Sequence, residues 1–216
     1  MDFVLKGLVS RFVKQDKGER PVRLTSQGSL AVAQVEPEYA ELARGGRIFA
    51  AVTGVSSTFK APVVAIPSTT ATWAVWNGEP DGGASYLILQ ASAFLASGTA
   101  GVGGSLIAAV SLIRHAAQTA YANSILQSLS GGNKDTKAVL ANAVTIAGTQ
   151  PPWIQIAAAD WAASTTIGVG LVAPVKGLFL VQPGGLFCLD VLSGVGTTAL
   201  YGVSVVWAEV EVDVEQ

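Results

Sequence analysis

The sequence is short of ionisable side chains. Of its 216 residues, 13% are Asp, Glu, Lys or Arg and 50% are hydrophobic, whereas charged residues make up about 25% of an average soluble domain. So few charges cannot coat the whole surface of a free monomer. We therefore predict that part of the outer surface is buried against partner proteins.

Cysteine and histidine are almost absent, with only Cys188 and His115 present. One cysteine excludes a disulfide within the chain and a multi-cysteine metal site, and one histidine excludes a histidine-rich site. Neither a G-x-S-x-G motif nor a phosphate-loop lysine occurs. The isolated acids Asp160 and Asp190 are interpreted as structural, because glycosidic acid/base chemistry needs paired carboxylates. We expect a protein that is not an enzyme and uses no cofactor or metal.

A long uninterrupted hydrophobic segment is also lacking. Residues 82–113 contain no charge and would be long enough to cross a bilayer. Residues 97–104 interrupt them with a glycine-rich segment, and the apolar parts on either side have only the length of strands. We predict no membrane span. The first eight residues also lack the features of a secretory signal, which disfavours export by that route.

Residues 1–28 are predicted to form an arm. Apolar residues recur at helical spacing in 1–15, which indicates a short amphipathic helix, and the polar residues that follow predict an extended connection. Six basic residues stand against three acids up to residue 23. Docking on a neighbouring subunit is favoured over nucleic-acid binding. The candidate assembly residues of the arm are Val4, Leu5, Leu8, Val9, Phe12, Val13, Arg20 and Arg23.

Residues 29–216 are predicted to form one all-β domain, a jelly-roll-like antiparallel sandwich. Short apolar or alternating runs rich in Val, Ile, Thr, Ala and aromatics alternate with Gly, Pro, Asn and Ser, which is typical of strands and turns. A short helix ended by glycine is expected at 37–45, and residues 111–130 stay undecided between strands and helical turns. Strands are predicted at 29–35, 47–54, 62–66, 71–76, 85–95, 105–113, 137–146, 153–159, 175–181, 185–192 and 199–213.

Two local features sharpen this expectation. Residues 182–185, Gln-Pro-Gly-Gly, interrupt two apolar runs and predict a tight connection in a hairpin. In the last strand the alternation of apolar residues changes parity between Trp207 and Val210, which predicts a bulge or a change of packing partner.

Four tryptophans are candidate interface aromatics: Trp73, Trp76, Trp153 and Trp161. They could also form a platform on which sugars stack, so a carbohydrate- or receptor-binding module is an alternative of another class. Trp73 and Trp76 would lie on opposite faces of a regular strand. Packing in a core or an interface is therefore the favoured role.

Several stretches resemble the virion proteins of bacteriophages, in particular jelly-roll capsid cement or decoration proteins. They are VQPGGLFCL at 181–189, TTALYGVSVVWAE at 197–209, and RLTSQGSL at 23–30 leading into ELARGGRIF at 41–49. The resemblance implies a non-catalytic protein that stabilises a capsid by associating with copies of itself and by packing on the major capsid protein or other virion proteins. The oligomer that it favours is a trimer. It implies a location in the virion, assembled in the host cytoplasm. A shell-forming single jelly-roll capsid protein is the alternative within this class.

Overall fold

The structure is a computed structural model. The predicted arm at 1–28 and the predicted strand at 29–35 lie outside the residues that it describes. The described residues are 39–54, 59–111, 113–129, 135–146, 150–162, 170–194 and 197–211.

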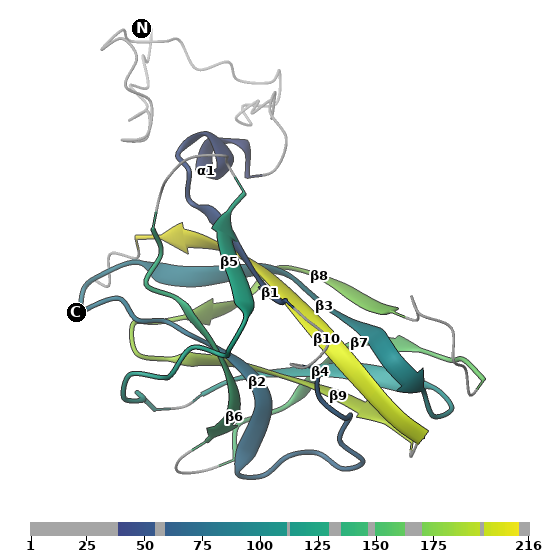
Figure 1. The fold of residues 1–216 in the computed structure, drawn as a ribbon. Coiled ribbons are helices and arrows are strands. Elements are labelled where there is room, and N and C mark those ends of the chain that lie inside the picture. The colour runs from purple at the N-terminus through teal and green to yellow at the C-terminus, as the bar shows by residue number, and fades with distance from the viewer. Residues whose placement is uncertain are drawn as a thin grey trace, which may run out of the picture.

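The described chain is almost entirely β-structure, with one short helix, α1 (Ala40–Arg44) (Figure 1). Among the described residues no helix is long and apolar enough to cross a membrane. The uncharged segment 82–113 instead supplies two strands and the connection between them. The strands are β1 (Ile48–Thr53), β2 (Thr70–Trp76), β3 (Ser85–Thr99), β4 (Gly104–Val110), β5 (Ser124–Ser128), β6 (Val139–Thr145), β7 (Ile154–Ala159), β8 (Gly170–Val181), β9 (Leu186–Ser193) and β10 (Thr197–Val210).

Two five-stranded antiparallel sheets pack face to face (Figure 1). The first sheet has the order β5-β1-β10-β3-β8 and the second the order β6-β2-β9-β4-β7. Consecutive strands pass from one sheet to the other throughout the described chain, apart from β6 and β7, which are the two edges of the second sheet. The predicted all-β sandwich is confirmed.

Eight of the strands pair in a nested order. β1 pairs with β10, β2 with β9, β3 with β8 and β4 with β7, all antiparallel. Nested antiparallel pairs arise when one long hairpin is rolled into a sandwich, which is the topology of a jelly roll. β5 and β6 lie between β4 and β7 in sequence, and they add a strand beside β1 and β2 respectively.

The main core lies between the sheets and is built by alternation along the strands. β1 alternates strictly between half-buried and buried residues, as a strand with one face on a core does. The ring of Phe49 stacks on that of Trp207 with centroids 6.0 Å apart, and the ring of Tyr86 lies 5.6 Å from Trp207. Trp73, from the second sheet, belongs to the same core cluster.

One predicted strand needs correction, and one undecided segment contains a strand. Residues 62–66 form no strand, and Val63 makes only an isolated bridge to Leu192. The apolar run is flanked by Pro62 and Pro67, which have no N–H for a strand ladder. Conversely, β5 lies in the undecided segment 111–130.

The predicted hairpin at 175–192 is also wrong. β8 and β9 belong to different sheets, so residues 182–185 carry the chain from one sheet to the other. A tight turn in the sequence does not reveal whether the strands it joins pair with each other. No bulge lies between Trp207 and Val210 of β10, where one was predicted, because this segment pairs in register with Ser85–Ile88 of β3. The pairing of β10 with β3 is irregular instead at Thr197/Thr198, Leu200/Tyr201 and Val206/Trp207, and at the last of these β3 carries Leu89 as an extra residue.

Candidate assembly surface

The central part of the second sheet is buried on both faces, whereas its edge strand β7 has exposed and half-buried residues. In β2, Trp73 and Val75 belong to the main core, whereas Ala74 and Trp76 belong to a second apolar cluster on the opposite face. The Trp153 indole packs against this cluster and its Nε1 donates a 2.8 Å hydrogen bond to the carbonyl of Pro67. The buried members of the second cluster are Ala71, Ala74, Ala109, Ala141, Val144, Ile146, Leu186 and Cys188.

The outer face of the first sheet is covered less by the described part of the chain, mainly where the ring of Phe59 packs on that of Phe94 beside Gly202. Its inner residues belong to the main core, but its outer residues belong to neither apolar cluster. The five strands of this sheet contain Lys176 and Glu209 and no other Asp, Glu, Lys or Arg. This face is therefore both accessible and nearly uncharged.

The most exposed apolar part of this face is a row on β8, which we call the β8 stripe: Val172, Pro174, Leu178 and Leu180. The exposed fractions are 61% for Val172, 66% for Leu178 and 37% for Leu180. The intervening residues Leu171, Ala173, Phe179 and Val181 are buried in the main core. Alternation thus points the stripe away from the core, at the edge of the sheet.

The edge of β8 is poorly suited to pairing with another strand. Pro174 offers no N–H, and Lys176 and Gly177 have positive φ angles of 52° and 82°. Between Ile88 and Gln90 of β3 the pairing with β8 also shifts register. Prolines, lysines and bulges are the devices with which sheet edges resist edge-to-edge pairing. A partner of this region would therefore pack on its face.

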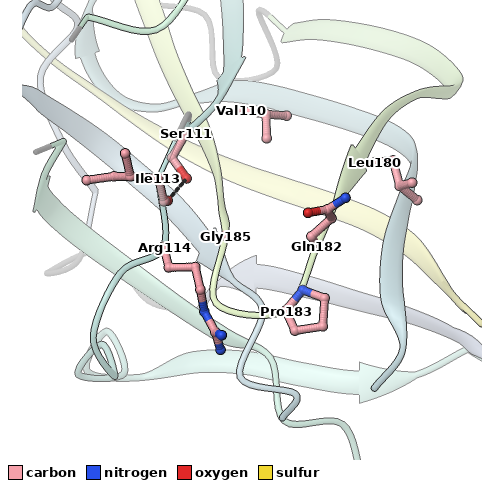
Figure 2. A pocket seen from close by; sticks show the side chains of 8 residues that line it. All are labelled: Val110, Ser111, Ile113, Arg114, Leu180, Gln182, Pro183 and Gly185. Atoms are coloured by element: carbon pink, nitrogen blue, oxygen red, sulfur yellow. Dashed lines mark hydrogen bonds between the residues drawn. The ribbon is translucent and has the colours of Figure 1, made fainter. Parts of the chain in front are cut away.

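A hollow of about 230 Å³ adjoins the stripe (Figure 2). Leu180 belongs to both the stripe and the hollow. Figure 2 shows Leu180, Gln182 and Pro183 on one side of it, facing the segment that follows β4. The full lining is Val110, Ser111, Ile113, Arg114, Leu180, Gln182, Pro183 and Gly185.

Hydrogen bonds and an ion pair hold the wall opposite Leu180 in place. The hydroxyl of Ser111 donates to the carbonyl of Ile113 at 3.1 Å and accepts from the amide of Leu186 at 2.9 Å. The guanidinium of Arg114 is paired with Asp81. The wall is thus fixed by its own contacts, which leaves the apolar side chains of the hollow for a partner.

Two titratable groups of β9, Asp190 and Cys188, are buried in the second sheet. The carboxylate of Asp190 is fully buried and accepts from the amide of Thr72 at 3.2 and 3.3 Å. Burial raises the pKa of Asp190 to about 6. Burial, with a smaller contribution from Asp190, raises the pKa of Cys188 to about 12, so its thiol is a poor nucleophile.

The other candidate groups, Asp160 and His115, form no site with Asp190. Asp160 lies exposed after β7, and burial lowers the pKa of His115 in the segment after β4. Among the described residues no group of three or more His, Cys, Asp and Glu side chains could hold a metal.

The four predicted tryptophans do not form one surface. Trp73 lies in the main core, and Trp76 and Trp153 pack against the second cluster. Trp161 is half-buried, and its Nε1 donates a 2.8 Å hydrogen bond to the carbonyl of Gly101. The predicted arm residues lie outside the described chain.

The β8 stripe was not among the residues singled out from the sequence. The sequence did carry a signal for this surface, because residues 170–181 are apolar at both odd and even positions. That pattern is typical of a strand buried on both faces. β8 nevertheless has one face open in the described chain.

No protein-family model matches the sequence, and no curated protein matches it. Comparison with solved structures finds a chain from a cryo-electron microscopy structure of Mud Crab Dicistrovirus. The two chains are 12% identical, and the match covers 97% of this chain and 86% of the other with a TM-score of 0.17. A TM-score this low carries no argument about fold or function.

Proposed function

We propose that the chain is a non-catalytic structural protein of a virus particle. In this proposal it stabilises a capsid as a cement or decoration protein, by associating with copies of itself and by packing on the shell. The observation that carries it is the accessible, nearly uncharged outer face of the first sheet with the β8 stripe at its edge. The assignment to phage virions rests on the resemblance of 181–189 and 197–209, which contribute to β9 and β10.

The physical argument starts from the stripe. Soluble monomers rarely leave contiguous apolar patches larger than a few hundred Å² in water, and larger ones mark interaction sites. An association of standard size removes about 1,600 Å² from water. Closed symmetry repeats the same contact around an axis, and a trimer is the oligomer we favour. Several modest contacts of one oligomer with a shell then add through effective concentration.

The oligomeric state of the full chain tests this proposal. In size-exclusion chromatography with light scattering we expect a small stable oligomer, which favours the cement role. Large closed shells would favour the shell-forming alternative. A chain that stays monomeric at high concentration would contradict both.

A pair of variants locates the contact. Leu178→Asp places a charge in the β8 stripe and should weaken self-association at least tenfold. Val102→Asp is the matched control, because Val102 is 67% exposed and Leu178 66% but Val102 lies outside the first sheet. Equal effects of the two variants would remove the stripe from the proposed interface.

A further inference from the structure

We infer that the β8 stripe is covered by residues 1–15 of a second copy of the chain, with Phe12 inserted in the adjoining hollow. This inference rests on the proposed function and names the partner segment for its surface. The amphipathic pattern of 1–15 supplies an apolar face that needs a surface to lie on.

The dimensions of the segment and the surface agree. The ends of the stripe, Val172 and Leu180, pair with Ser92 and Leu87 of β3, and these two residues are five steps or about 17 Å apart in an extended strand. Residues 4–13, which hold the apolar positions of the arm, would form a helix about 15 Å long. A helix is about 10 Å wide and strands are about 4.8 Å apart. One helix would therefore cover β8 together with its neighbour β3, whose Leu87 lies opposite Leu180.

The hollow gives this contact an anchor point. Its volume is about 230 Å³, and a cavity of roughly 150 Å³ is enough to hold benzene. Leu180, Pro183 and Val110 provide apolar walls next to the stripe, and the polar side chains of Ser111, Arg114 and Gln182 line the rest. Aromatic side chains that fill such pockets contribute most of the binding energy in many interfaces. Phe12 is the aromatic residue on the apolar face predicted for the arm.

Docking would also supply the charge that the sheet lacks. The first 23 residues hold six basic and three acidic side chains, whereas the strands of the first sheet hold one of each. Lys6, Arg11 and Lys14 lie off the apolar face of the predicted helix and would point to solvent or to the shell. Within the stripe, the stem of Lys176 can lie along apolar surface with its ammonium in water.

The exit point of the arm places the β8 stripe within its reach. α1 buries none of its residues, and Figure 1 shows it beyond the end of β1, away from the packed sheets. Ile48, Ala208, Leu87 and Leu180 form one row across the sheet, so β8 is only about 14 Å from β1. Residues 16–38 can span up to about 75 Å, so the arm can reach its own stripe or that of a neighbouring copy. The self-association in the proposed function assigns it to the neighbouring copy.

Disulfide trapping tests the inference in the full-length chain. Two variants, Phe12→Cys and Leu180→Cys, are mixed, oxidised and separated on a non-reducing gel. The native Cys188 is buried and should not interfere. We expect a covalent dimer that contains one chain of each variant. Phe12→Cys mixed with Val102→Cys is the matched control and should give at most a tenth of that product.

The remaining outcomes separate this inference from the proposed function. If the oligomer forms but no mixed disulfide appears, the inference fails and the assembly role stands. If Phe12→Cys and Leu180→Cys in one chain give only an intrachain disulfide, the arm covers its own sheet and the second copy is excluded. A monomeric full-length chain overturns the assembly role itself.

A substitution in the arm gives a second measurement. Phe12→Asp should weaken self-association at least tenfold in light scattering, whereas Gln15→Asp, just after the apolar positions, should change it less than twofold. Equal association of Phe12→Asp and the unaltered chain would overturn the inference.

Discussion

The two sheets of this sandwich are built from similarly apolar strands but differ in what covers them. The second sheet has an outer cluster of buried apolar side chains, against which Trp76 and Trp153 pack. The first sheet exposes the β8 stripe and shows no such cluster in the described chain. Apolar residues at both parities of a strand therefore indicate that both faces are covered, but not whether the cover is the same chain or a partner.

The largest expected effect comes from placing a charge on each outer face in turn. Ala109→Asp buries an unpaired carboxylate in the second cluster, where the residue is 0% exposed, and should reduce the free energy of unfolding by about 4 kcal/mol or more. Ala50→Asp puts the same group on the half-buried outer side of β1 and should change it by about 1 kcal/mol or less. Urea unfolding of dilute chains measures both. Similar losses would mean that the two faces are equally covered within one chain.

The next effect concerns Asp190, whose carboxyl is buried in the second sheet. Its pKa is raised from 3.8 to about 6, a difference worth about 3 kcal/mol. The folded state therefore binds the proton more tightly than the unfolded state, so the stability that protonation provides is complete below pH 4 and is lost as the pH rises through 6. Asp190→Asn keeps an acceptor for the Thr72 amide and should stabilise the fold by up to about 3 kcal/mol at pH 8.

The pH dependence makes this prediction specific. Below pH 4 the stabilisation by Asp190→Asn should vanish, because both side chains are then neutral. Asp160→Asn is the control, since Asp160 is exposed and its substitution should change stability by less than about 0.5 kcal/mol. A benefit of Asp190→Asn that is the same at pH 4 and pH 8 would contradict the assignment to the buried charge.

The smallest expected effect tests the open face of the first sheet. The hydroxyls of Ser92 and Ser204 are 2.6 Å apart across β3 and β10. A double-mutant cycle with Ser92→Ala and Ser204→Ala should give a coupling of about 0.5–1 kcal/mol. A coupling above about 2 kcal/mol would indicate a hydrogen bond shielded from water, and so a covered face.

Much of the fold could be predicted from the sequence because its signals are local. Runs rich in Val, Ile and Thr, separated by glycine and proline connections, predicted the all-β sandwich. The helix expected at 37–45, ended by glycine, corresponds to α1. The pairing of the strands could not be predicted in the same way. Residues 182–185 look like a hairpin turn, but whether β8 pairs with β9 depends on strands far away in the sequence.

The candidate site was harder to predict than the fold. The sequences around Leu178 and Cys188 are similarly apolar, so they do not reveal that Leu178 is exposed and Cys188 is buried. Burial depends on how the connections between strands cross each sheet. The tryptophans were predicted to be interface residues because of their large apolar side chains, but Trp73 lies in the main core. The shortage of charge predicted that a surface would be covered, but not which one.

The nested order of strand pairing has a consequence for synthesis of the chain. β1 is made early, but its neighbour β10 comprises residues 197–210, which leave the ribosome more than 140 residues later. Contacts between such distant segments form slowly, since a long loop must be closed first. The sandwich therefore cannot be completed during translation until β10 has emerged.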